Sequence, residues 1–98
     1  MIIKKDRILA ILKNFKENHA KEYGIVEIGI FGSIARNEEK EDSDIDIVFK
    51  TDIPNLFRTA RMKVELEKIF EKPIDIVRLR DNMNSQLKQN IIREACYV

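Results

Sequence analysis

The sequence has 98 residues, a length that fits one folded domain over residues 1–98 and leaves no room for a second domain of ordinary size. Hydrophobic residues make up 44% of the chain and charged residues 36%, which is typical of a soluble globular protein. The formal net charge of +1 gives no general attraction to nucleic acid or to an anionic membrane, so any bound anion must be held locally.

The single cysteine, Cys96, excludes an internal disulfide bond. The start of the sequence, Met1 to Asp6, lacks the long apolar run of a signal peptide. No stretch approaches the roughly 20 apolar residues that cross a bilayer. We therefore expect a cytoplasmic protein that does not act at a membrane.

Apolar residues recur at helical spacing from about residue 6 to residue 22, which predicts an amphipathic helix with Asp6 as its N-cap. His19 continues this apolar stripe, and we interpret it as a half-buried residue near the helix end. Gly24 ends the helix, and the β-branched residues of 25–31 predict a first strand.

Residues 33–36 are expected to form one helical turn, followed by an exposed polar loop over residues 37–42. Over residues 44–49 acidic and apolar side chains alternate, which predicts a half-buried second strand. Ile45, Ile47 and Phe49 would share one face of this strand, and Asp44 and Asp46 the other.

The remaining elements follow in chain order. Residues 51–54 are expected to open a helix that continues over 56–70, because proline is tolerated in a first helical turn. Residues 74–77 predict a third strand, and residues 82–97 a last helix. The resulting fold class is α/β or α+β, with a three-stranded sheet flanked by about four helices.

The alternation in the second strand has a chemical consequence, because residues two apart along a strand point the same way. Asp44 and Asp46 therefore hold their carboxylates close together, which is costly unless a cation lies between them. Mg²⁺ is the expected cation, since it prefers carboxylate, phosphate and water oxygens. Asp75 lies in the third strand and could complete a three-carboxylate cluster if the two strands are neighbours.

The turn before these acids suits a phosphate group. Gly32 lets a phosphate approach the backbone, and the Ser33 hydroxyl and the next amides can donate hydrogen bonds to it. Arg36 is expected either to neutralise phosphate charge or to pair with the acidic loop. Together these groups favour phosphoryl or nucleotidyl transfer, in which Asp75 could also accept the proton of the attacking hydroxyl.

Gly32-Ser33, followed after ten residues by Asp44-x-Asp46, resembles the motif of the minimal nucleotidyltransferases of the DNA polymerase beta superfamily. The similarity extends to Ala35-Arg36, Asp75 and Ile92-Arg93-Glu94-Ala95, and so covers nearly the whole chain. It implies a nucleotidyltransferase fold with a mixed sheet.

The resemblance also implies roles for individual residues. Gly32 and Ser33 would bind the triphosphate of ATP, and Asp44, Asp46 and Asp75 would bind Mg²⁺ and act in catalysis. Small members of the family commonly act as the antitoxin of a toxin–antitoxin pair, and some transfer AMP to a tyrosine of a ribonuclease with a HEPN domain. A HEPN-domain toxin is therefore the expected partner.

Two other hypotheses remain open at this point. The chain could be a binding module that neutralises its partner by occupying a surface, within a homo- or hetero-oligomer. It could also add nucleotides to another acceptor such as RNA, although the near-neutral charge makes nucleic acid an unlikely direct partner.

Overall fold

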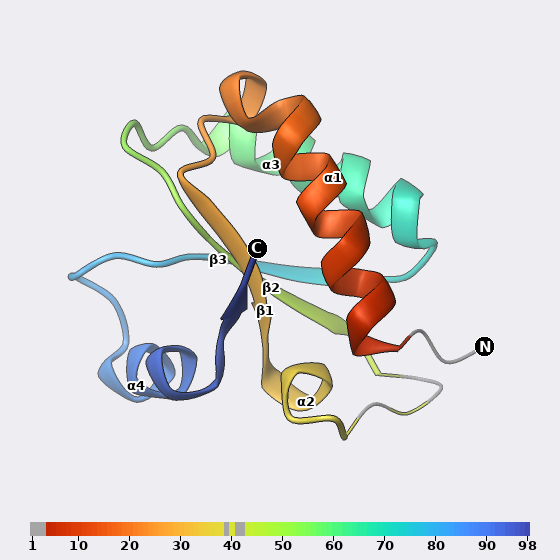
Figure 1. Ribbon diagram of the computed structural model, residues 1–98. Helices are drawn as coiled ribbons and strands as arrows, with labels where there is room; N and C mark the ends of the chain where they lie inside the picture. Colours follow the sequence, from red (N-terminus) through yellow and green to blue (C-terminus); the bar gives the residue numbers. More distant parts are fainter. Residues whose placement is uncertain (1–3, 39, 41–42) are drawn as a thin grey trace.

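A four-stranded mixed sheet forms the centre of the computed structural model, which describes residues 4–38, 40 and 43–98 (Figure 1). The strand order is β3-β2-β1-β4. β1 runs antiparallel to both β2 and β4, whereas β2 runs parallel to β3. The strands are β1 (Glu27–Phe31), β2 (Ile45–Lys50), β3 (Ile74–Arg78) and β4 (Cys96–Tyr97).

Four helices cover the sheet: α1 (Lys5–Tyr23), α2 (Gly32–Ala35), α3 (Leu56–Phe70) and α4 (Ser85–Glu94). α1 and α3 lie together on one face of the sheet, and α4 lies on the other (Figure 1). This arrangement confirms the mixed sheet flanked by helices. The expected strand number of three was wrong, because the C-terminal segment adds a fourth strand.

The larger core lies between the sheet and the α1–α3 layer. The predicted apolar stripe of α1 is buried there, as is the predicted apolar face of β2. Burial of such surface stabilises the fold by about 25 cal/mol per Å². Its fully buried side chains include Ile8, Leu12, Ile28, Ile30, Ile45, Ile47, Met62, Leu66 and Phe49, the last at 1% exposure.

A second, smaller core lies under α4 on the opposite face. Phe31, Val48 and Ile91 form its centre, and Leu87 and Ala95 pack against it. Val48 lies on the same face of β2 as Asp46, because residues two apart in a strand share a face. The face that carries the acids is therefore apolar farther along the strand.

The starts of α1 and α3 differ from the sequence predictions. Lys4, rather than Asp6, precedes α1, and Asp6 lies in the first turn, where a carboxylate interacts favourably with the helix dipole. α3 begins after Pro54, with Asn55 as the N-cap whose side chain accepts a hydrogen bond from the Arg58 amide. Residues 51–54 therefore lie outside the helix. The predicted range 56–70 is confirmed.

The last predicted helix was too long at both ends. Asn84 caps its start by accepting a hydrogen bond from the Leu87 amide, and the helix ends at Glu94. Cys96 and Tyr97 then pair with β1. Gly29 allows this pairing, because a Cβ on Gly29 would overlap the Cys96 carbonyl and the Tyr97 backbone.

None of the helices in the described part of the chain is long and apolar enough to span a bilayer. Met1, Ile2 and Ile3, and the predicted loop residues 39, 41 and 42, lie outside the described residues.

Candidate functional site

Asp46 and Asp75 lie side by side near the starts of two neighbouring parallel strands, β2 and the edge strand β3. Asp46 of β2 is the register partner of Asp75 of β3 and, on its other side, of Phe31 of β1. Residues in one register row point to the same face, so both carboxyls lie on the α4 side of the sheet. The second and third strands are therefore neighbours, which is the condition that the sequence analysis set for Asp75 to join the other acids.

Asp44 lies immediately before β2, which begins at Ile45 rather than at Asp44 as predicted. It is exposed, whereas Asp46 is half-buried and Asp75 is exposed. The three acids therefore differ in environment, although the sequence pattern alone treats them as similar.

The half-buried position of Asp46 changes its acidity. The pKa of its carboxyl is raised from 3.8 to about 6, chiefly by burial and also by the charges of Asp75 and Asp44 and a hydrogen bond with Asp75. The guanidinium of Arg36 acts in the opposite direction and lowers this pKa. Its ionised form thus lacks sufficient positive charge nearby, and a bound cation would supply it.

Gly32 begins α2 directly after β1 and faces this carboxyl. Its φ is +75°, in the left-handed region that glycine adopts without steric cost. A Cβ added to Gly32 would overlap Asp46 Oδ2 and lie 3.1 Å from its Cγ. The turn and the acid therefore adjoin each other, as required for a site that holds both a phosphate and a cation.

Ser33 is the second residue of α2, a helix of four residues. The first amides of a helix have no acceptor within the helix and can donate to a phosphate oxygen. Ile34 and Ala35, which follow, are buried and hold the turn against the core. The structure thus brings Gly32 and Ser33 to the edge of the acid row.

Arg36 ends α2 and makes two ion pairs. Its Nε lies 3.1 Å from Glu38 Oε2, and its NH1 lies 3.0 Å from Glu94 Oε1 at the end of α4. These two carboxylates raise the pKa of Arg36, with the hydrogen bond to Glu38 as the largest cause. The guanidinium therefore pairs with the loop, one of the two alternatives, and also lies close enough to Asp46 to influence it.

Three further contacts hold the segments around the site. Lys5 Nζ donates to the Ala35 carbonyl at 3.0 Å, which ties α1 to the end of α2. Lys72 Nζ donates to the Ser43 carbonyl at 3.0 Å, next to Asp44. The Ile74 amide donates to Glu67 Oε2 at 3.2 Å, next to Asp75. Each of these hydrogen bonds fixes the backbone of a residue that is adjacent in sequence to a predicted site residue.

The donor set suits Mg²⁺, which proteins usually hold through one or two carboxylates, with phosphate and water oxygens completing the shell. Asp46 and Asp75 provide such a pair. In residues 4–38, 40 and 43–98, no three acidic, histidine or cysteine side chains stand together as a full set of metal ligands. The three-carboxylate set of Asp44, Asp46 and Asp75 stays a prediction.

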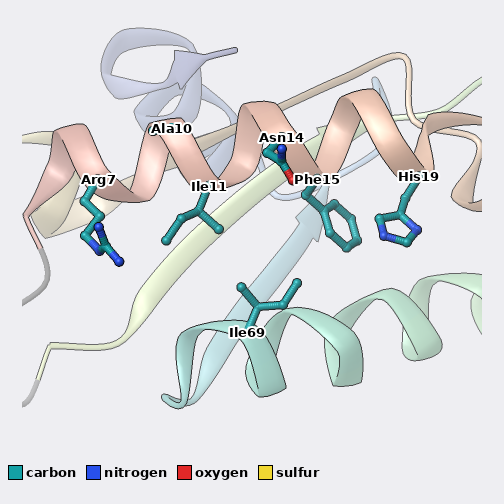
Figure 2. A pocket seen from close by; sticks show the side chains of 7 residues that line it. All are labelled: Arg7, Ala10, Ile11, Asn14, Phe15, His19 and Ile69. Carbon is teal, nitrogen blue, oxygen red and sulfur yellow. The ribbon is translucent and has the colours of Figure 1, made fainter.

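A separate hollow of about 400 Å³ lies between α1 and α3, on the face of the sheet away from the acids (Figure 2). His19 borders it, with its ring 4.6 Å from that of Phe15 and its Nδ1 2.8 Å from Glu22 Oε1. Among the described residues that line it, Arg7 carries a positive charge and none has a carboxylate. His19 is thus a half-buried residue near the helix end, as expected.

Glu94, Lys5 and Lys72 are residues of the site region to which the sequence analysis gave no role. Glu94 lies 58 positions after Arg36 and Lys5 lies 30 positions before Ala35, so no spacing rule relates them. Glu94 belongs to the segment that carries the family resemblance, which is the one indication of its importance in the sequence.

Comparisons with known proteins agree with this geometry. The family model described as "Polymerase beta, Nucleotidyltransferase" matches residues 11–98. "Protein adenylyltransferase MntA" of Thermococcus cleftensis is 34% identical over 94 residues, which cover 95% of this chain and 94% of that protein.

Two solved structures share the fold. One, of a candidate minimal nucleotidyltransferase, has a TM-score of 0.71 and 33% identity, and covers 90% of this chain and 93% of that chain. The other is the tri-AMPylated Shewanella oneidensis HEPN toxin in complex with MNT antitoxin, with a TM-score of 0.65 and 17% identity. That match covers 91% of this chain and 70% of that chain, and it shows the fold.

The family model spans nearly the whole chain, and in the structure Gly32 lies against Asp46, the register partner of Asp75. The expected nucleotidyltransferase fold and enzyme class are confirmed. The chain belongs to the polymerase beta nucleotidyltransferase family and is a nucleotidyltransferase.

Proposed function

We propose that this chain is a Mg²⁺-dependent protein adenylyltransferase that transfers AMP from ATP to a tyrosine of a HEPN-domain ribonuclease and thereby neutralises it as an antitoxin. The observation that carries the proposal is the register pair of Asp46 and Asp75 beside the Gly32 turn. The relative from Thermococcus cleftensis is named a protein adenylyltransferase. A structural neighbour is an MNT antitoxin with an AMPylated HEPN toxin.

Asp44, Asp46 and Asp75 would hold Mg²⁺, which would neutralise charge on the triphosphate as the pyrophosphate leaves. Gly32 brings the turn directly against the Asp46 carboxylate, so phosphates bound at the turn would lie beside the acid row, where the α2 amides and the Ser33 hydroxyl would donate to their oxygens. Arg36, positioned by Glu94, adds a fixed positive charge at the edge of this site.

The reaction forms one bond and breaks another. The tyrosine oxygen of the acceptor attacks the α-phosphorus of ATP, and the bond from that phosphorus to the pyrophosphate oxygen breaks. The tyrosine proton passes to the carboxylate of Asp75, which is exposed and adjoins Asp46. Pyrophosphate is the second product.

The test is transfer of label from [α-³²P]ATP, with Mg²⁺, to the cognate HEPN-domain protein. Wild-type protein labels a tyrosine of that partner, and the Asp44→Ala, Asp46→Ala double variant does not. Asp52→Ala is the matched control, because Asp52 is an exposed acid beyond the other end of β2 and retains full labelling. Absence of labelling, or labelling by the double variant, contradicts the proposal.

A second candidate is a module that neutralises its partner by binding alone. It is favoured by Leu56 and Phe57, two large apolar side chains that are exposed at the start of α3. The two functions separate in cells that express the toxin. If the Asp44→Ala, Asp46→Ala variant still protects those cells, binding alone accounts for neutralisation.

A further inference from the structure

The outer edge of β3 borders a hollow of about 440 Å³ that is distinct from the acid row. It lies between β3 and the start of α3. Its lining residues are Pro54, Asn55, Leu56, Thr59, Ile76, Arg78 and Arg80. We call this region the β3-edge surface, and include in it Phe57, the neighbour of Leu56.

The apolar part of the β3-edge surface is unusually exposed. Leu56 and Phe57 are each 87% exposed, although they are adjacent and lie in the first turn of α3. Burial of a side chain of this kind is worth about 1.5–3 kcal/mol. Two such side chains beside a hollow therefore indicate a place where another molecule binds.

The charged side chains that line the hollow are all positive. Arg78 and Arg80 line the hollow, and no acidic side chain does so among the described residues. Arg80 NH1 donates to the Arg78 carbonyl at 2.9 Å, which keeps the two residues together. A ligand with a carboxylate complements this end of the surface.

β3 is also an edge strand, since it pairs only with β2 in the described sheet. Two of its outward backbone groups already have partners, the Ile74 amide with Glu67 and the Arg78 carbonyl with Arg80, so a further strand from another chain would pair at Ile76 between them. Side chains of an added strand alternate between the two faces of the sheet. Some would then enter the hollow beside Ile76, and their neighbours would lie on the face that carries Asp75.

The β3-edge surface and the acid row both include residues of β3, so the two regions adjoin. Asp75 and Arg78 are three residues apart in β3, about 10 Å along a strand. A segment bound along this edge therefore passes the carboxylate that would take the acceptor proton.

We propose that the β3-edge surface docks an extended segment of the acceptor protein, with an apolar side chain in the hollow and a carboxylate on Arg78 and Arg80. The proposal rests on the proposed function, because it assumes a protein acceptor. A second copy of this chain fits less well, since it would bring its own arginines toward these arginines. The apolar pair favours protein over nucleic acid.

The experiment measures the Kd between this chain and the HEPN-domain protein by calorimetry. Two double variants test the surface: Leu56→Ser with Phe57→Ser, and Arg78→Glu with Arg80→Glu. Each is expected to weaken partner binding by at least about tenfold, with the Kd for ATP unchanged. The matched control is Val64→Ser with Ile92→Ser, because both side chains are exposed and lie outside the surface.

The possible results are distinguishable. If wild-type protein binds and labels the partner, and both surface variants bind it equally well, this inference is wrong while the proposed function stands. If wild-type protein neither binds nor labels it, both fail. Binding of a single-stranded RNA of about 20 nucleotides that is lost in the arginine variant, without partner binding, assigns the surface to RNA instead. A dimer in sedimentation that Leu56→Ser with Phe57→Ser dissociates assigns it to a second copy.

Discussion

Asp46 and Asp75 are register partners in neighbouring parallel strands, and their carboxyls lie on the same face of the sheet. This relationship joins two parts of the sequence that are 29 positions apart, and the charge of Asp75 is one cause of the raised pKa of Asp46. The pair is thus costly in the free protein and suited to binding a cation.

The first prediction concerns stability. The pKa of the Asp46 carboxyl is about 6 in the folded state and 3.8 in the unfolded chain, so the folded state binds more protons between these pH values. Its contribution to stability is therefore lost as the pH rises through about 6. The full shift corresponds to roughly 3 kcal/mol, and solvent screening of a half-buried group reduces this to about 1 kcal/mol.

We expect Asp46→Asn to raise the free energy of unfolding by about 1 kcal/mol at pH 8 and to leave it unchanged below pH 3.8, where both forms are neutral. Urea denaturation at several pH values measures this. Asp81→Asn is the control, because Asp81 is fully exposed. An Asp46→Asn protein less stable than wild type at pH 8 would contradict the prediction.

The second prediction concerns metal affinity. Mg²⁺ binds the ionised carboxylate, so protons compete with it below the pKa of about 6. The Kd for Mg²⁺ is expected to be about tenfold weaker at pH 5 than at pH 7.5. Calorimetry in two buffers of different ionisation enthalpy should detect proton release near pH 6. Asp46→Asn should abolish that release.

The third prediction concerns the turn. Gly32→Ala places a Cβ against Asp46 Oδ2 at a φ of +75° and should destabilise the fold by about 1–2 kcal/mol. It should also weaken ATP binding, because the Cβ displaces the Asp46 carboxylate from its place beside the turn. Adding Asp46→Ala removes the overlap, so the Gly32→Ala cost should be smaller in that background. If Gly32→Ala lowers the stability equally in both backgrounds, the whole loss comes from the positive φ and not from the overlap with Asp46.

The fourth prediction concerns Arg36 and Glu94, whose side chains lie 3.0 Å apart. Glu94→Ala should weaken ATP binding by about three- to tenfold, because Arg36 loses a carboxylate that is only 13% exposed. If Glu94 acts by holding Arg36, the double Arg36→Ala, Glu94→Ala variant should bind ATP no more weakly than Arg36→Ala. Glu94→Gln should retain most of the affinity. Additive losses would show that Glu94 acts independently.

The fifth prediction concerns the smaller core. Ile91 is fully buried against Phe31 and Val48, so Ile91→Ala should cost about 2–4 kcal/mol. Its neighbour Ile92 is 66% exposed, and Ile92→Ala should change stability by less than about 0.5 kcal/mol. Thermal unfolding of the two variants compares them directly. Similar losses would mean that α4 does not pack as described.

Local patterns predicted much of the fold. The apolar stripe of α1, the alternation of β2 and the range of α3 follow from helical and strand periodicity, which depends on the covalent chain alone. Periodicity predicted a single helix over residues 82–97, which was wrong because the helix ends at Glu94 and residues 96–97 form a strand. The fourth strand there depends on Gly29, a contact 67 positions away from Cys96.

The sequence by itself determined the family motif, the alternation of side chains in β2 and the turn at Gly32, because each of these is a property of residues close together in the chain. The tertiary structure decided that Asp75 lies beside Asp46, that Glu94 holds Arg36, and that Leu56 and Phe57 are exposed. Those relationships depend on which strands pair and how helices pack, and these follow from the burial of the whole core rather than from any local spacing.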